Sequence, residues 1–227
     1  PANGQPIAVP SQDMILGCYY LTKSKSDDLN SGKLFSSLNE VLLAHENKAI
    51  GLHAIINLRH KDNWIKDTTT GRAIFNSILP DELDYINKLI DKKLLTEIVN
   101  QCYLIAGNYK TVIFLDQLKE LGFNMATYSG VSISISDVLV PAEKGKILAG
   151  AYDKVEEIKM KYDRHVLTEG ERYNKVIDVW THATKQMAEA MEDELRQDAD
   201  GFNPVFMMSD AGARGSKDQI KQLAGMR

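Results

Sequence analysis

Two apolar stripes with helical spacing, both within residues 141–198, constrain the fold of this chain more than any other feature. Residues three or four positions apart share one face of a helix, so such a stripe marks the side that packs inward. The first stripe comprises Ile147, Ala151, Val155, Ile158 and Tyr162. The second comprises Tyr173, Val176, Ile177, Trp180, Ala183, Met187, Met191 and Leu195. The sequence therefore predicts two long helices over Pro141–Asp198.

The connection between these helices is short, which makes them antiparallel neighbours. The pattern breaks at residues 163–165, and Thr168 with Glu171 then forms a T-x-x-E capping box, a typical helix start. The outward positions carry many charged residues, as solvent-exposed faces do. We interpret the hairpin either as a structural support or as a projecting arm that partner proteins grip.

Composition and charge limit the class of protein. At 227 residues, with 44% hydrophobic and 26% charged residues, the chain is typical of a soluble globular protein of one or two domains. Its net charge of −4 argues against a free-standing nucleic-acid binder, which would have a basic surface. No apolar run is long enough to span a membrane, and no signal peptide is apparent. Cys18 and Cys102 lie outside any C-x-x-C motif, so we expect reduced thiols and a cytoplasmic location.

The region before the hairpin changes character at residue 81. The earlier part contains an extended run at 7–9, an apolar run at 14–21, a helix at 37–45, a strand at 53–58, a polar turn at 61–70 and an apolar run at 71–79. From residue 81, helical spacing predicts three helices, at 83–90, at 94–105 ending at Gly107, and at 111–121 ending at Gly122. A short extended segment follows at 132–140. We therefore predict an α+β fold that is predominantly helical, with a mixed, mainly β first section.

One segment has the composition of an anion-binding loop. Residues 209–216 read S-D-A-G-A-R-G-S, in which Gly212 and Gly215 permit positive φ and Arg214 offers a forked cation. Ser216, with Gln219 three residues later, matches a capping box at the start of a helix. Amides beside a helix N-terminus favour an anion. The same sequence is also compatible with an ordinary turn, and it has neither the Walker lysine pattern nor the Rossmann spacing.

The other candidate residues do not complete an active site. His53 and His60 flank Arg59 without a third metal ligand at a plausible spacing, and we expect no metal site. The sequence contains no nucleophile elbow, and we expect no carboxylate cluster that would hold magnesium. The chain begins with Pro1 rather than Met and stops at Arg227, shortly after Gly225, so we expect a piece of a longer polypeptide. From these features alone the chain is an interaction surface within a larger machine; a free-standing hairpin module and a stand-alone anion-binding enzyme are the alternatives.

Four long motifs resemble one family, in the order in which that family carries them. They are PANGQPIAVPSQDMILGCYYLT at 1–22, TTGRAIFNSILP at 69–80, TEGERYNKVIDVW at 168–180 and FNPVFMMSDAGARGSKDQIKQLAGMR at 202–227. Together they resemble the largest catalytic subunit, beta-prime, of bacterial DNA-directed RNA polymerase. The resemblance extends over essentially the whole chain.

The resemblance implies a division of the chain and a role for each part. Residues 1–140 correspond to the pore domain, which lines the secondary channel through which NTPs enter. Residues 141–227 correspond to the funnel domain, in which the hairpin at 141–198 supplies the rim helices and 209–216 resembles the F-loop. The intact enzyme is a nucleotidyltransferase of transcription. Its magnesium loop, bridge helix and trigger loop are absent here, so the fragment is expected to be inactive and Mg²⁺ to be bound by residues outside this chain.

The resemblance also implies particular site residues and partners. Arg214 corresponds to an arginine near the triphosphate of the incoming NTP. The residues expected to support the active centre are Gln12, Gly212, Gly215 and Ser216. Those expected to meet docked regulators or, in some lineages, ppGpp are Glu171, Asn174, Lys175 and Asp178. Lys221 departs from the family, where arginine is common. The implied partners are the alpha, beta and omega subunits, the rest of beta-prime, NTPs and secondary-channel transcript-cleavage factors, with DNA and RNA bound only in the full enzyme and no membrane contact.

Overall fold

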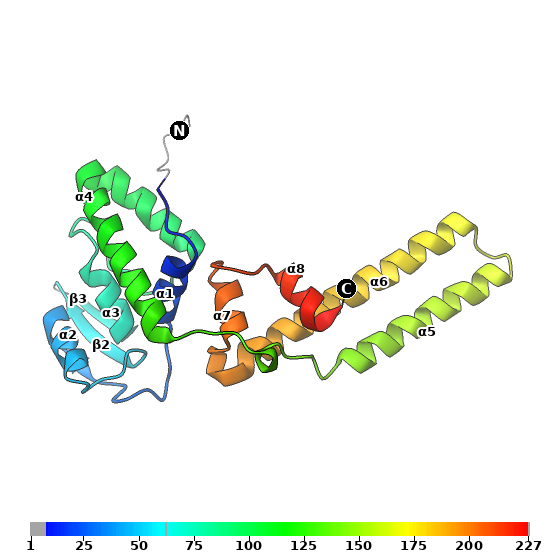
Figure 1. Ribbon diagram of the computed structural model, residues 1–227, viewed down its shortest axis with the longest axis horizontal. Helices are drawn as coiled ribbons and strands as arrows, with labels where there is room; N and C mark the ends of the chain where they lie inside the picture. The colour runs from blue at the N-terminus through cyan, green and yellow to red at the C-terminus, as the bar shows by residue number, and fades with distance from the viewer. Residues whose placement is uncertain (1–7, 62, 227) are drawn as a thin grey trace. The chain divides into compact units, whose positions relative to one another are not determined.

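The structure, a computed structural model, describes residues 8–61 and 63–226 (Figure 1). The chain divides into two compact units. Unit 1 contains the residues up to Val131 together with Asp210–Arg214, and unit 2 contains Ser132–Ser209 and the residues from Gly215 onward. Helices predominate and one small sheet is present, which confirms the predicted helical α+β class. Among the described residues, no helix is both long enough and apolar enough to cross a membrane.

The sheet of unit 1 has three strands in the order β1-β2-β3. Strand β1 (Leu34–Phe35) pairs in parallel with β2 (Ile55–His60), and β2 pairs antiparallel with β3 (Asn63–Thr69). Helix α2 (Leu38–Glu46) is capped by Ser37, whose side chain accepts a hydrogen bond from the Glu40 backbone amide. The sheet and this helix enclose one core cluster, which comprises Phe35, Val41, Ile50, Ala54, Ile56, Leu58 and Ala73.

The remaining helices of unit 1 pack closely because glycines lie at their crossings. Helix α1 (Asp13–Thr22) packs against α3 (Thr70–Ser77) and α4 (Lys92–Ser129). A Cβ added to Gly17 would lie 1.9 Å from the Gly122 carbonyl oxygen, and one added to Gly71 would lie 1.8 Å from the Leu21 carbonyl oxygen. Only glycine permits such an approach of two backbones.

Helix α4 consists of two helical segments that meet at a kink. Gly107 adopts φ 78° and ψ 172°, and Figure 1 shows the bend. The helix then continues to Gly130, whose left-handed conformation closes its C-terminus. The predicted interruption at Gly107 is therefore confirmed. The predicted stop at Gly122 is wrong, because that glycine serves the contact with α1 instead.

Unit 2 is built on the predicted hairpin. Helix α5 (Lys144–Asp163) and helix α6 (Glu169–Gln197) run side by side, which confirms two contacting helices over Pro141–Asp198 (Figure 1). The Thr168–Glu171 capping box is present, with the Thr168 hydroxyl accepting the Glu171 amide and the Glu171 carboxylate accepting the Thr168 amide. The other elements of this unit are η1 (Ile135–Asp137), η2 (Asp198–Gly201), α7 (Pro204–Asp210, with Asp210 itself assigned to unit 1), α8 (Lys217–Ile220) and η3 (Lys221–Gly225).

Burial along α6 is uneven. Its second half contributes Met191 and Leu195 to a core cluster completed by Val205, Phe206, Ile220 and Ala224. Towards the connection to α5, the apolar stripe has only the other arm to pack on, so Tyr173 and Ile177 remain exposed. Two aromatic contacts join the arms: Tyr152 lies edge-on to Trp180, and the Arg172 guanidinium lies over the Tyr162 ring. Trp180 is accordingly half-buried in the seam.

Several local predictions for the first section are wrong. The apolar runs predicted at 14–21 and 71–79 lie in helices α1 and α3, so this section is not mainly β. The polar turn predicted at 61–70 is largely strand β3, whose residues up to Asp67 are solvent-exposed or half-buried. The strand predicted at 53–58 is confirmed as β2. The extended run at 7–9 falls partly outside the described residues.

Two later predictions also differ from the structure. The described residues 81–91 form a loop rather than the predicted helix. Side chains hold this loop: Asn76 bonds both the amide and the carbonyl of Ile86, and the Thr22 hydroxyl accepts the Ile90 amide. The segment predicted to be extended at 132–140 contains the short η1 helix, which a capping box between Ser134 and Asp137 starts.

Candidate functional site: the arginine loop

Residues 209–216, named here the arginine loop, join α7 to α8. Gly212 (φ 68°) and Gly215 (φ 81°) both adopt the left-handed conformation that their residue type permits. At the end of the loop, the Ser216 hydroxyl accepts a hydrogen bond from the Gln219 backbone amide. The Gln219 side-chain oxygen accepts one from the Ser216 backbone amide, which confirms the predicted capping box. The sequence pattern therefore located both the glycines with positive φ and the helix start.

Arg214 is exposed between these two glycines. Its side chain makes no hydrogen bond or ion pair with any residue in the part of the chain that the structure describes. A guanidinium carries five donors in a planar fork that matches the oxygens of a phosphate. The arginine is thus available to bind an anion without first breaking an internal contact.

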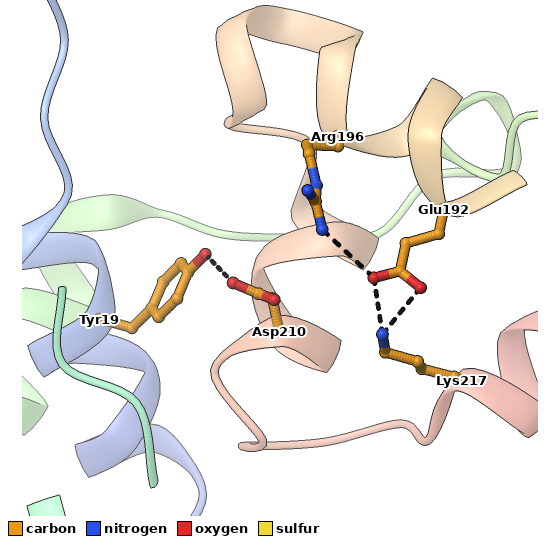
Figure 2. A network of polar contacts seen from close by, with 5 residues as sticks. All are labelled: Tyr19, Glu192, Arg196, Asp210 and Lys217. Atoms are coloured by element: carbon orange, nitrogen blue, oxygen red, sulfur yellow. Dashed lines mark hydrogen bonds and ion pairs between the residues drawn. The ribbon is translucent and has the colours of Figure 1, made fainter. Parts of the chain in front are cut away.

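The first half of the loop is fixed to unit 1. The Tyr19 hydroxyl of α1 donates a 2.6 Å hydrogen bond to Asp210 Oδ2 (Figure 2). The Lys92 amide donates a 3.0 Å bond to the buried Ala211 carbonyl, and a Cβ on Gly212 would lie 3.3 Å from Lys92 Cβ. Arg214 follows Ala211 by three residues, a reach of about 10 Å in an extended chain.

The N-terminus of α4, which contacts the arginine loop, carries partial positive charge. Lys92 is the first residue of α4, and the first amides of a helix carry partial positive charge. Ala211 satisfies one of these amides, and the Asp91 side chain satisfies the Leu94 amide. Lys92 and Lys93 add two exposed cations at this end, where acidic residues would be the stabilising choice. The arrangement favours anions near the arginine loop.

Lys23 lies close to Tyr19. Its ammonium group is 5.4 Å from the centroid of the Tyr19 ring. Partial burial lowers the pKa of Lys23, while the Asp210 carboxylate acts in the opposite direction. The Asp210 carboxylate therefore accepts a hydrogen bond from Tyr19 of α1 and attracts the ammonium group of Lys23, the residue that directly follows α1.

Gln12 has a strained backbone that the sequence did not reveal. It precedes α1 with φ 46° and ψ −113°, and its exposed side chain makes no capping bond. A non-glycine residue in a sparsely populated region costs about 1–3 kcal/mol, and such strain is concentrated at functional sites. Gln12 belongs to unit 1, as does Arg214, so the structure assigns both predicted residues to one compact unit.

The predicted regulator-docking residues lie together on one helix, α6, although their settings differ. Glu171 is engaged in its capping box, and the hydrogen bonds from Thr168 hold the pKa of the Glu171 carboxyl below its usual range. Asn174, Lys175 and Asp178 are exposed. Asp178 also lines a cleft of about 740 Å³ between α5 and α6. Small and apolar residues line part of this cleft, and the rest of its lining is polar or charged and includes Lys146, Lys154, Asp178, His182, Glu189 and Asp193.

A polar network that sequence reasoning missed connects α8 to α6. Lys217, directly after the arginine loop, donates to both carboxylate oxygens of Glu192 at 2.6 and 2.7 Å. Arg196 approaches the same carboxylate at 3.4 Å (Figure 2). Lys217 and Glu192 are 25 positions apart and on different helices, so no local spacing rule could have paired them.

The two candidate histidines, His53 and His60, have structural roles. His53 is buried, lies edge-on to the Tyr20 ring and places Nδ1 3.0 Å from the Lys23 carbonyl. His60 stacks at a tilt on Tyr85. Within residues 8–61 and 63–226, no group of three or more His, Cys, Asp or Glu side chains is placed to hold a metal ion.

Comparison with known proteins gives consistent matches over the chain. Residues 1–138 match the family described as RNA polymerase Rpb1, domain 3, and residues 167–227 match RNA polymerase Rpb1, domain 4. Similar proteins from Salinibacter ruber and Pelotomaculum thermopropionicum, 45% and 46% identical, are each described as DNA-directed RNA polymerase subunit beta′. The alignments cover 100% of this chain but only 16% and 19% of those relatives, so the chain spans less than a fifth of their length.

Proposed function

The chain belongs to the RNA polymerase Rpb1 family, and from this premise we propose that it lines the secondary channel of the polymerase and supports nucleotide addition. In this proposal the intact enzyme transfers nucleoside monophosphates from NTPs to the RNA 3′ end. The chain acts together with the alpha, beta and omega subunits and the rest of beta-prime in the cytoplasm. Its own contribution is a cation for the NTP and a surface for regulators.

The observation that carries the proposal is the exposed Arg214 on a loop anchored to unit 1. The triphosphate of an NTP is negatively charged before and during nucleotidyl transfer, and a fixed cation binds it throughout without reorganising at the moment of reaction. A guanidinium held between Gly212 and Gly215 meets this requirement, since its fork can take two phosphate oxygens at once. Lys92 and Lys93 extend the positive region and favour the approach of the anion.

The test is Arg214→Ala in the intact polymerase, with single-nucleotide addition measured over a range of NTP concentrations. Loss of a hydrogen bond to a charged group costs about 1.5–3 kcal/mol, so we expect kcat/KM to fall by at least about tenfold. Arg214→Lys keeps the charge but not the fork and should recover only part of the loss. Unchanged kinetics in Arg214→Ala would reject the role.

We further propose that the α5–α6 hairpin is a docking site for transcript-cleavage factors and related regulators, with ppGpp as a lineage-dependent ligand. The supporting observation is that Asn174, Lys175 and Asp178 are exposed beside the apolar, exposed Tyr173 and Ile177. We expect Lys175→Glu in the intact polymerase to weaken binding of a cleavage factor. Lys159→Glu on the outer face of α5 is the matched control. Equal binding by both variants would contradict this role.

We propose that the magnesium ions of the intact enzyme are bound by residues outside this chain. When bound by the rest of the enzyme, magnesium supplies the Lewis acid for nucleotidyl transfer. We therefore propose that the 227 residues alone are inactive. Template-directed RNA synthesis by the purified chain would refute this proposal. It would also favour the alternative that the chain is an independent enzyme.

A further inference from the structure

The arginine loop is attached to α1 by a side-chain contact whose function has not yet been assigned. Tyr19 donates a 2.6 Å hydrogen bond to Asp210 (Figure 2), and the two residues are 191 positions apart in the chain. Hydrogen bonds to a carboxylate are shorter and stronger than those between neutral groups. A contact of this length and sequence separation fixes the start of the loop on a distant part of the fold.

The donor of this bond is itself buried. The Tyr19 side chain is only 1% exposed and is among the largest fully buried side chains of the protein. It belongs to α1, which packs against α4 with backbones in close contact at Gly17. The ring cannot shift without disturbing this packing, so its hydroxyl is a fixed reference point.

A second contact sets the direction in which the loop leaves. The Lys92 amide holds the Ala211 carbonyl, and Gly212 lies against the Lys92 side chain. The loop is therefore held at consecutive residues by α1 and by the first turn of α4. Arg214 lies three residues beyond the second attachment, so these two contacts limit the region that its guanidinium can reach.

We propose that Tyr19 is a positioning residue for Arg214: by holding Asp210, its hydroxyl keeps the arginine loop where the guanidinium meets the triphosphate of an NTP. The inference rests on the proposed function, because it takes the NTP as the ligand of Arg214. Tyr19 touches no reacting atom in this account. It contributes by orienting the Arg214 guanidinium, because small displacements of such a group weaken its contact with the ligand.

The test is Tyr19→Phe in the intact polymerase, which removes the hydroxyl and keeps the ring. We expect the KM for NTP to rise by about tenfold while kcat changes by less than about twofold, because a loosened loop chiefly weakens binding. Tyr20→Phe is the matched control, since it removes the adjacent hydroxyl and leaves the Tyr19–Asp210 bond in place. A Tyr19→Phe enzyme with unchanged KM would overturn the proposal, whatever its thermal stability.

Combining variants separates positioning from general support of the fold. If Tyr19 acts through Arg214, adding Tyr19→Phe to Arg214→Ala should change KM by less than about twofold further. Asp210→Ala removes the acceptor and should raise KM as Tyr19→Phe does, and the pair together should be no worse than either alone. Effects of Tyr19→Phe and Arg214→Ala that multiply independently would overturn the positioning role. Unchanged kinetics in Arg214→Ala would instead reject the proposed function itself.

Discussion

Gly17 and Gly122 face each other where α1 crosses α4, and a Cβ on Gly17 would lie 1.9 Å from the Gly122 carbonyl oxygen. The obstacle is backbone and cannot rotate away. Gly17→Ala must therefore force the two helices apart. Overpacking of this kind typically costs about 1–3 kcal/mol, and we expect the upper end or more, measured as the free energy of unfolding in urea.

Gly150→Ala is the matched control for this prediction. Gly150 is also a helical glycine, in α5, but a Cβ there meets nothing within 4 Å. Alanine in an exposed helix is better than glycine by about 0.5–1 kcal/mol, so this variant should be slightly more stable. Similar stability of the two variants would show that the backbones are not in close contact at Gly17.

His53 should make the stability of unit 1 depend on pH. Burial lowers the pKa of His53; the Lys23 carbonyl and the Asp28 carboxylate act in the opposite direction, whereas the charges of Lys23 and Lys25 lower it further. The folded pKa thus lies below the unfolded value of about 6.5, so the unfolded chain binds more protons in between. The contribution of His53 to stability is complete above about pH 6.5 and falls as the pH decreases towards the folded pKa.

This pH dependence can be measured from urea unfolding at about pH 5 and pH 7.5. His53→Gln removes the titrating group, so the difference in unfolding free energy between the two pH values should be smaller in the variant. The other histidines remain in both proteins and cancel in the comparison. Identical pH dependence in the two proteins would contradict the assignment to His53.

Met187 and Met160 test the two environments along the hairpin. Met187 on α6 is fully buried, whereas Met160 on α5 is 48% exposed. Truncation of a buried methionine to alanine costs about 2–5 kcal/mol, because folding then buries less apolar surface and a cavity is left behind. Met160→Ala should change the unfolding free energy by less than about 1 kcal/mol. Equal effects would mean that both arms are packed alike.

The Glu192 network should contribute little and should depend on salt. Lys217 is 70% exposed, so its attraction to Glu192 is screened by water and ions despite the two short contacts. We expect Lys217→Met to cost about 0.2–1 kcal/mol in low salt and less in high salt. Lys185→Met, which removes the looser 3.9 Å pair with Glu189, should have no measurable effect. A cost for Lys217→Met that persists in high salt would contradict this account.

The hairpin could be predicted from sequence because its arms have one inward face each. An amphipathic helix repeats its apolar residues with the helical period, and the capping box at Thr168 marks the start of α6. Helix α1 gives no such signal, because it is buried on most sides and reads as a continuous apolar run. Strand β3 was missed for the opposite reason, since it is an edge strand whose residues up to Asp67 are polar or exposed.

The loop at 81–91 shows a further limit of periodicity. Its apolar residues have helical spacing, but Asn76 and Thr22 supply side-chain partners for its backbone groups and so stabilise another conformation. Partners this distant in sequence cannot be anticipated from a local window. The same holds at the candidate site: the sequence indicated Gly212, Arg214 and Gly215, but not the attachment of the loop to Tyr19.

The Tyr19–Asp210 bond also has a consequence for how the protein is made. The donor leaves the ribosome 191 residues before its acceptor. At about 5–20 residues per second, α1 must wait roughly 10–40 s for the segment that completes unit 1. During synthesis the first helices are therefore without their last partner until the hairpin has been translated, and the nascent chain depends on the order in which its distant parts emerge.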